Sequence, residues 1–425
     1  MWYTIDVDIQ RCVTILLPPD ADLRATLDVF RDLQNKVSAA ALGGGTPLRA
    51  VELQRAVYHA VKGRLSSQMT ITALRLVAGA YASAKRNRAR RLRAEERRKK
   101  RCAAKGRTYT PRTISPLRLC RFERPAALFL VGQRGRDADF RADGTLSIWT
   151  VGGRKHLPYT IPTALRPLVE AAKEIDSVTV IERGGRLYGR VALTLEAPEP
   201  KGVVPVGIDL NETNAVVAVD AAGREFWLSG KDIKVRNKRT AQTWARVQRK
   251  LATKKAEKRD RRSVQRLLKR LSGRRRRRTQ DFARVAAKQL LAWAPADAVL
   301  VFEDLRVPRP QKGLTRGTAL RRRLALWQYA AIRTAAQNKA QMAGIAVAFV
   351  NPAYTSKVCS RCGLVGRRRR HLFTCPHCGY CAHADVNAAT NVRHRFVQLR
   401  LDAASSAAAE ALPTGEGKPK SFSFG

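Results

Sequence analysis

The chain has 425 residues, of which 82 are lysine or arginine and 34 are aspartate or glutamate, so its formal net charge is +48. The length favours two or three domains with a sizeable core, and the ordinary apolar content argues against global disorder. A compact protein with this much charge of one sign repels itself unless a polyanion neutralises it. Nucleic acid is the obvious partner.

A membrane role is a poor alternative, because no apolar run approaches the length of a spanning helix. The N-terminal residues begin directly with strand-like alternation and carry no export signal, so we expect a cytoplasmic protein; in a prokaryotic host it would associate with the nucleoid when bound to DNA. Four of the eight cysteines fall in two Cys-x-x-Cys pairs. In a chain without an export signal, this pattern predicts reduced thiols and one metal site.

The first half of the chain alternates between strand and helix patterns. A long first strand ends at Pro18 and Pro19, and residues 23–101 read as three helices. The third helix runs into residues 85–107, which hold 13 basic and two acidic side chains and cannot pack inside a core. Residues 110–199 return to strand patterns, so the sequence predicts one β domain interrupted by a helical one, followed by a linker at "EAPEPKG".

The second half predicts an α/β layer with a mixed sheet. Residues 203–230 read as strands joined by tight turns, and residues 236–278 form a helical stretch with 20 basic and two acidic side chains. An amphipathic helix, the strand "AVLVFED", a helix closed by Gly344 and the strand "IAVAFVNP" follow. The arginine runs at 274–278 and 367–370 are expected to be flexible, and residues 402–425 to form a disordered tail.

The cysteine pairs predict a structural zinc site. Cys359, Cys362, Cys375 and Cys378 offer four thiolates, which close the coordination sphere of Zn²⁺ and leave no position for water. Each pair ends in glycine, which lets the backbone turn so that its amides face the sulfurs. His377 and Cys381 are alternative ligands off the paired spacing, and a redox pair is the alternative to zinc.

Three acids have a shared interpretation. Asp209 and Glu303 each end a strongly apolar strand, and Asp385 opens a helix. Each alone is more often a solvated acid, but together they supply the oxygen ligands that Mg²⁺ requires. Two such ions about 4 Å apart catalyse phosphodiester hydrolysis. In a chain this basic, the combination points to a nuclease.

At these residues the sequence resembles a known family. "GIDL", "FEDL", "NPAYTSKVCSRCG", "FTCPHCG" and "ADVNAATNV", in this order, are similar to the split RuvC domain with inserted zinc ribbon of TnpB proteins, the transposon-encoded relatives of type V CRISPR effectors. The resemblance covers much of residues 203–395. It implies that Asp209, Glu303 and Asp385 are the catalytic, metal-binding triad. Asn211 stands where the family usually has glycine, and His383 where an acid is common.

The resemblance implies a multidomain α/β protein. An RNase H-like RuvC nuclease domain with an inserted zinc ribbon would follow a β-barrel-like wedge domain that is interrupted by a helical recognition lobe. The expected boundaries are 1–22 and 110–200 for the wedge domain, 23–109 for the recognition lobe, 201–355 and 383–401 for the nuclease domain, 356–382 for the ribbon and 402–425 for the tail.

The basic helices are predicted to contact phosphates, with affinity that falls steeply with salt; merely solvated faces are the alternative, although such faces usually mix both signs. The candidate contacts are Arg88, Arg91, Arg98, Arg246, Lys250, Arg262, Arg275 and Arg276. The resemblance implies a guide RNA, a single- or double-stranded DNA target and protein recognition of a short adjacent motif. We expect a monomer or a dimer.

The sequence is therefore interpreted as an RNA-guided DNA endonuclease with structural Zn²⁺ and two catalytic Mg²⁺ ions. One alternative is an RNA-guided DNA-binding protein with weak or no cleavage. The other is an unguided RuvC-like nuclease or transposase. A cleavage assay separates the first alternative, and a uniform small RNA that copurifies with the protein would count against the second.

Overall fold

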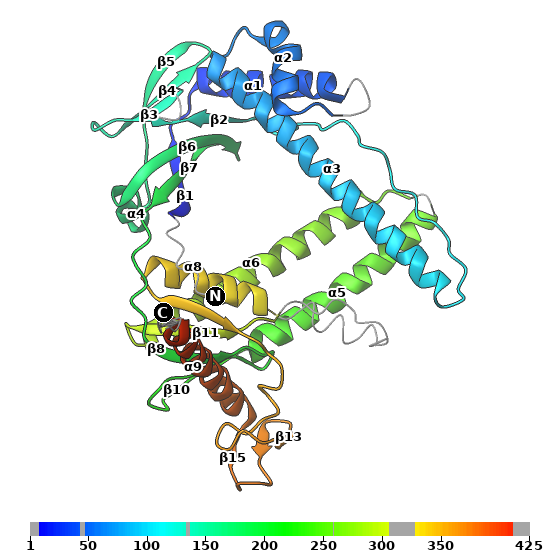
Figure 1. Cartoon of the computed structure of the whole chain (residues 1–425). Helices are drawn as coiled ribbons and strands as arrows, with labels where there is room; N and C mark the ends of the chain where they lie inside the picture. The colour runs from blue at the N-terminus through cyan, green and yellow to red at the C-terminus, as the bar shows by residue number, and fades with distance from the viewer. Residues whose placement is uncertain (1–7, 43–46, 133–136, 258, 306–327, 411–425) are drawn as a thin grey trace, which may run out of the picture. The chain divides into compact units, whose positions relative to one another are not determined.

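The computed structural model describes residues 8–42, 47–132, 137–257, 259–305 and 328–410 (Figure 1). Two compact units are present: one is Val7–Glu196, and the other holds the described residues from Ala197 onward. Each unit has its own core. Among the described residues, no helix is long and apolar enough to cross a membrane.

The strands of the first unit follow one another around a ring. One antiparallel sheet has the order β1, β7, β6, β2, and a second has the order β3, β4, β5. Single bridge pairs join them, Val131 with Ala138 and Leu16 with Thr160, which gives a barrel-like closure. The strand bounds are Ile9–Leu17 (β1), Ala126–Leu130 (β2), Ala138–Phe140 (β3), Thr145–Thr150 (β4), Gly153–Pro158 (β5), Ala172–Arg183 (β6) and Arg186–Leu195 (β7).

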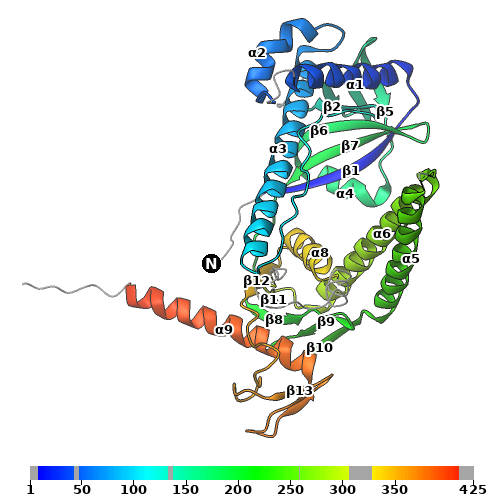
Figure 2. The ribbon, with the colours of Figure 1, turned by 90° about the vertical axis from the view of Figure 1, so that its right-hand side faces the viewer.

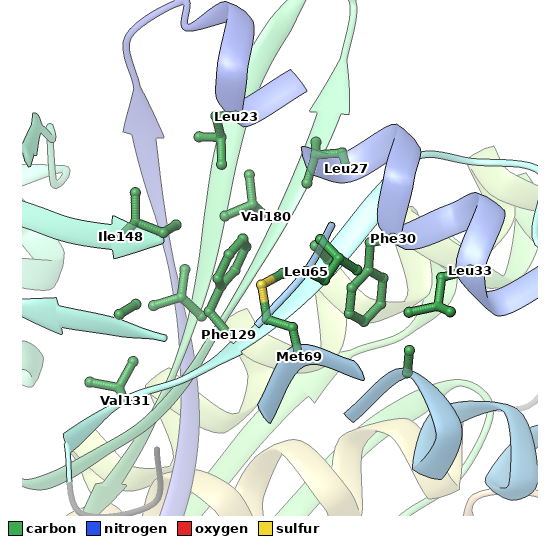
Figure 3. Packing of buried hydrophobic residues seen from close by; sticks show 14 of the residues in the cluster. Leu23, Leu27, Phe30, Leu33, Leu65, Met69, Phe129, Val131, Ile148 and Val180 are labelled. Carbon is green, nitrogen blue, oxygen red and sulfur yellow. The ribbon is translucent and has the colours of Figure 1, made fainter. Parts of the chain in front are cut away.

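Three helices lie between β1 and β2 along the chain: α1 (Ala21–Leu42), α2 (Ala50–Val61) and α3 (Ser67–Ala103). Side chains of α1 and α3 pack with those of the strands in one apolar core, as Figure 3 shows for Phe30, Met69 and Phe129. The buried residues of α3 end at Tyr81. The rest of this helix is the basic segment, which faces solvent because its side chains cannot be buried unpaired. A short helix, α4 (Arg166–Glu170), precedes β6.

The second unit is built on a mixed five-stranded sheet with the order β10, β9, β8, β11, β12. β8 pairs with β9, and β9 with β10, in antiparallel fashion, whereas β11 is parallel to both β8 and β12. The bounds are Val204–Asp209 (β8), Asn214–Val219 (β9), Glu225–Ser229 (β10), Ala298–Glu303 (β11) and Ala346–Val350 (β12). This is the mixed sheet that the sequence predicts.

Helices cover both faces of this sheet, as Figure 2 shows. Alternate residues of β8 and β11 pack against α6 (Arg262–Trp293) and α8 (Tyr329–Met342), and the intervening residues face α9 (Ala384–Glu410). Gly207 lets α9 approach β8 closely, because a Cβ atom there would lie 2.0 Å from the carbonyl oxygen of Ala389. The tight contact brings the start of α9 to the end of β8.

Two expectations about irregular segments are wrong. The arginines at 274–278 lie within α6, which also joins the basic stretch to the amphipathic helix, because arginine has high helix propensity and a single Gly273 does not break the helix. The tail expected from 402 is helical to Glu410, since its alanine-rich sequence continues α9. Residues 411–425 lie outside the described residues. α5 (Lys231–Ala256) packs beside α6.

A small three-stranded antiparallel sheet lies between β12 and α9 along the chain. It consists of β13 (Arg367–Arg369), β14 (Leu372–Thr374) and β15 (Cys381–His383). Arg370, between β13 and β14, has a φ of 57°. The arginine run at 367–370 is therefore a strand followed by a tight turn, where flexibility was expected. Phe373 is fully buried among Cys359, Cys375 and Ala384, which gives this ribbon a core of its own.

Candidate active site

Two of the predicted acids end neighbouring strands. Asp209 is the last residue of β8 and Glu303 is the last residue of β11. Because β8 and β11 are parallel and Ile208 pairs with Phe302, both carboxylates lie at the same edge of the sheet. The apolar residues before them fill the core, so each strand can end with a side chain that leaves the core. Glu303 is further held by the Thr355 hydroxyl, which donates to its Oε1.

Asp385 reaches the same edge from the first turn of α9 and is 1% exposed. Its Oδ2 accepts a hydrogen bond of 2.9 Å from the side-chain amide of Asn214, the first residue of β9. Its Oδ1 accepts 2.9 Å from Nη2 of Arg368, which comes from β13 of the ribbon. The structure thus brings together all three acids that the sequence singles out.

Two of the three carboxylates have a raised pKa. For Asp209, burial is the largest cause, and together with the charges of Glu303 and Asp385 it raises the pKa to about 7, against smaller lowering contributions from Asn211 and Arg368. Burial also raises the pKa of Glu303, although the Thr355 hydrogen bond and the charge of Arg395 lower it in part. Clustered carboxylates whose negative charge is only partly balanced by Arg368 and Arg395 fit a site for divalent metal ions.

Asn211, which departs from the glycine common in the related family, shapes the loop beside Asp209. Its Oδ1 accepts hydrogen bonds from the backbone amides of Thr213 (2.9 Å) and Asn214 (2.8 Å), as in an Asx turn. Its side-chain amide lies 3.3 Å from Oδ2 of Asp209, to which it donates. The asparagine therefore orients one carboxylate of the site.

The four predicted cysteines form one cluster whose Sγ atoms all lie within 4.8 Å of one another. Cys359 and Cys378 are 3.7 Å apart, and Cys362 and Cys375 are 3.5 Å apart. These separations match the edges of a tetrahedron with zinc–sulfur bonds of about 2.3 Å. Cys381 lies on β15 outside the cluster, and His377 is likewise no member of it. The donor set fits Zn²⁺.

Glycine geometry explains how the cysteine pairs fold. Gly363 and Gly379 have φ of 75° and 67°, and their amides donate to the carbonyl oxygens of Cys359 and Cys375. Burial raises the pKa of the Cys375 thiol, but hydrogen bonds from the backbone amides of Cys378 and His377 lower it more, to about 6. A thiol that ionises readily is ready to bind a metal ion.

Asparagines of α9 fasten the ribbon to the sheet unit. Asn387 accepts 2.9 Å from the amide of Ser360 and donates 2.8 Å to the carbonyl oxygen of Val358. Asn391, one turn later, donates 2.8 Å to the same oxygen and 2.8 Å to that of Thr355. The helix that carries Asp385 therefore also holds the base of the ribbon, and it links the two clusters.

The basic residues predicted to contact phosphates all lie on helices, namely α3, α5 and α6. Arg98 is already engaged, because it donates to Glu95 (2.6 Å) and to the carbonyl oxygen of Thr110 (2.8 Å) and lies over the Tyr109 ring. The exposed ones are Arg91, Arg246, Lys250, Arg262 and Arg276, and the half-buried ones are Arg88, Arg98 and Arg275. The five exposed ones are available for a polyanion.

Sequence reasoning missed Arg368, Asn214 and Thr355 as members of the site. Arg368 was treated only as part of a basic run, and neither Asn214 nor Thr355 follows a motif that marks it. Asn214 lies a few residues after "GID", and Thr355 lies within "NPAYTSK". Apart from this position in the sequence, nothing marks either residue as part of a site. Their roles follow from the register of β9 and from the position of the ribbon.

Comparison with known proteins places this site in context. Residues 183–312, which include Asp209 and Glu303, match the OrfB_IS605 family, described as a probable transposase. Residues 329–392, which include the four cysteines and Asp385, match the Cas12f1-like TNB domain. A TnpB-like protein of Aquifex aeolicus is 34% identical over 116 residues, which are 26% of this chain and 37% of that protein.

The matched regions are similar to TnpB-like proteins and to compact type V effectors. A CRISPR-associated endodeoxyribonuclease Cas12f1 of Sulfoacidibacillus thermotolerans is 42% identical over 69 residues, 16% of each chain. The matched regions thus span well under two thirds of both relatives. The structure of CasPhi-2 (Cas12j) bound to crRNA superimposes with a TM-score of 0.51 at 13% identity, over 91% of this chain and 98% of that one. This likeness shows a shared fold.

Proposed function

We propose that this TnpB-like protein is an RNA-guided DNA endonuclease. The observation that carries the proposal is the cluster of Asp209, Glu303 and Asp385, with the pKa of Asp209 raised to about 7 by burial and by the other two acids. Such mutual repulsion is costly to a fold. It is relieved when divalent cations bind between the carboxylates, as a metal-dependent nuclease requires.

The three acids would hold the Mg²⁺ ions. Bound ions would activate a water molecule and neutralise the leaving oxygen in phosphodiester hydrolysis. Because its pKa is raised to about 7, Asp209 would be partly protonated near neutral pH. It would lose this proton when a cation binds. Asn211, Asn214 and Thr355 keep the carboxylates oriented, so little reorganisation is needed when they bind a cation.

Arg368 has a second role in this proposal. Its guanidinium lies 2.9 Å from Asp385 and is 38% exposed, so it can also contact a ligand at the mouth of the site. A guanidinium pairs well with phosphate oxygens. We assign Arg368 to the phosphate of the strand being cut, which makes the ribbon a contributor to the site as well as a scaffold.

Guide RNA and target DNA are the proposed polyanions. The exposed basic residues of α3, α5 and α6 supply the positive charge, and the superimposable CasPhi-2 structure contains a crRNA. In this proposal, base pairing between the guide RNA and the target DNA selects the target. The barrel-like unit with its three helices, expected as the wedge domain and recognition lobe, would read the adjacent motif.

The test begins with the full chain purified from its host. The RNA that copurifies is sequenced, and the complex is challenged with a matching DNA target flanked by randomised bases in the presence of Mg²⁺. We expect one uniform small RNA and cleavage that depends on both the match and the flank. Cleavage without any specific RNA would support an unguided nuclease or transposase, and target binding without cleavage would support an RNA-guided binding protein.

A further inference from the structure

Two histidines stand beside Asp385 without any assigned role. His371, His383 and Asp385 each place one potential ligand atom within 4.8 Å of the others, the same limit that the four cysteine sulfurs meet. His371 is exposed, His383 is 29% exposed, and Asp385 is buried. Solvent can therefore reach the group at His371, whereas its carboxylate, that of Asp385, is buried.

The surrounding contacts hold the histidines in place. The two imidazole rings are stacked with centroids 5.4 Å apart, and Trp227 of β10 packs edge-on against His383 at 4.7 Å. Leu372 pairs with His383 across β14 and β15, which brings His371 alongside. The carbonyl oxygen of His371 also accepts the amide of Ala384, at the start of α9. The ligand atoms are thus positioned by the backbone of the ribbon.

His383 contacts Asp385 directly. Nδ1 of His383 lies 3.8 Å from Oδ2 of Asp385 and 3.2 Å from the Asp385 amide, from which it accepts a hydrogen bond. Oδ1 of Asp385 accepts a hydrogen bond from Arg368, and Oδ2 accepts one from Asn214. Each carboxylate oxygen has a second lone pair, which remains for a cation.

We infer that His371, His383 and Asp385 form a binding site for a first-row transition-metal cation such as Ni²⁺, Co²⁺ or Zn²⁺. Imidazole nitrogen binds these ions well, whereas Mg²⁺ takes oxygen ligands almost exclusively. Ligand atoms of a tetrahedral site with bonds of about 2.1 Å are about 3.4 Å apart. The present atoms lie within 4.8 Å of one another, so binding would require the exposed His371 side chain to rotate toward the other two ligands.

The site has a consequence for catalysis, and this consequence alone rests on the proposed nuclease function. Asp385 belongs to both groups, so a transition metal held by the histidines draws its Oδ2 away from the catalytic carboxylates. Mg²⁺-dependent cleavage should then slow when a transition-metal ion is added. The histidines would make this protein sensitive to metals that a purely carboxylate site tolerates.

The test is isothermal titration calorimetry of Ni²⁺ into the full chain loaded with one Zn²⁺ per chain, without nucleic acid or Mg²⁺. Preloading keeps the cysteines occupied, so the titration reports other sites. We expect His371→Gln and His383→Gln each to weaken one binding event by at least about tenfold, with unchanged zinc content. His59→Gln, which removes an exposed histidine of α2, should change nothing. His371→Gln decides the result if His383→Gln fails to fold.

Equal Ni²⁺ affinity and stoichiometry in the parent and in His371→Gln would overturn the site. A second arm measures cleavage at fixed Mg²⁺ with and without Ni²⁺, and we expect inhibition of the parent and little of His371→Gln. Binding without inhibition would retain the site and reject the coupling. Absence of cleavage under all conditions would reject the proposed nuclease function and leave the binding result intact.

Discussion

The cysteine cluster and the carboxylate cluster are both sets of potential anions, but they are built in opposite ways. The four cysteines lie within 20 residues of one another along the chain, and two glycine turns position them. The three acids span residues 209 to 385 and meet only because two parallel strands and the start of α9 converge. One site is local, and the other is a product of the whole sheet unit.

The two clusters also differ in how their surroundings change the pKa of the groups that would bind a metal ion. In the cysteine cluster, burial raises the pKa of Cys375, but backbone amides and the thiols of Cys362 and Cys378 lower it to about 6. A backbone hydrogen bond at Leu364 lowers the pKa of Cys362, but burial and the other three thiols raise it to about 12. In the carboxylate cluster, burial and neighbouring charges raise the pKa of Asp209 to about 7. The closed thiolate set suits a structural ion, and the strained carboxylates suit ions that take part in chemistry.

The largest expected effect distinguishes the four clustered cysteines of the ribbon from Cys381, which lies outside the cluster. Cys375→Ser should abolish zinc binding and unfold the ribbon, because structural zinc contributes about 10 kcal/mol or more to the folding of such small modules. Cys381→Ser is the matched control, since Cys381 lies on β15 outside the cluster. The measurement is zinc per chain by atomic emission. Zinc loss in Cys381→Ser, or full zinc in Cys375→Ser, would contradict the assignment.

The next largest effect is expected for a substitution that disturbs the carboxylate site and leaves the zinc site intact. Gly207→Ala places a Cβ atom 2.0 Å from the carbonyl oxygen of Ala389, so α9 must move away from β8. We expect the free energy of unfolding to fall by about 3 kcal/mol, with zinc content unchanged. The control is Gly79→Ala in α3, where nothing lies within 4 Å and alanine should stabilise the helix slightly. Equal denaturation midpoints for the two variants would refute the close contact.

A smaller effect is a pH dependence that Asp209 adds to stability. Its folded-state pKa is raised to about 7, so the folded state binds more protons than the unfolded state above about pH 4. Stability should therefore fall by about 2 kcal/mol between about pH 5 and about pH 7 in Mg²⁺-free buffer. Asp209→Asn should remove this part of the slope, and so should added Mg²⁺. Parallel curves of stability against pH for the parent and Asp209→Asn would be inconsistent with the raised pKa.

The sequence predicted the parts of the molecule that repeat a short pattern. Cysteine spacing with following glycines identified the ribbon, and apolar strands that end in acids identified Asp209 and Glu303. The alternating runs of β8 and β9 and the continuous apolar run of β11 were clear because these strands pack against neighbours on one or both faces. These features are encoded within a few residues, so a single sequence reveals them.

Other parts depend on contacts between distant segments. Arg368 meets Asp385 because of the fold of the ribbon, and Asn214 meets it because of the turn that Asn211 shapes. The arginines at 274–278 were expected to be flexible, although they end a stretch that was predicted to be helical. They lie within α6, because arginine has high helix propensity. The barrel-like closure rests on two single bridge pairs, which alternation along one strand cannot reveal.

The central claim is that the carboxylates at the sheet edge form the cleavage site, and two adjacent acids test it most directly. Glu303 is the last residue of β11 and Asp304 comes next in the chain, but of these two acids only Glu303 is among the charges that raise the pKa of Asp209. Rates of guide-directed DNA cleavage in Mg²⁺ are compared for Glu303→Gln and Asp304→Asn, with target binding measured in parallel. The account predicts a loss of about a thousandfold or more, equivalent to about 4 kcal/mol, for Glu303→Gln alone, with binding retained. Cleavage by Glu303→Gln at the rate of Asp304→Asn would contradict it.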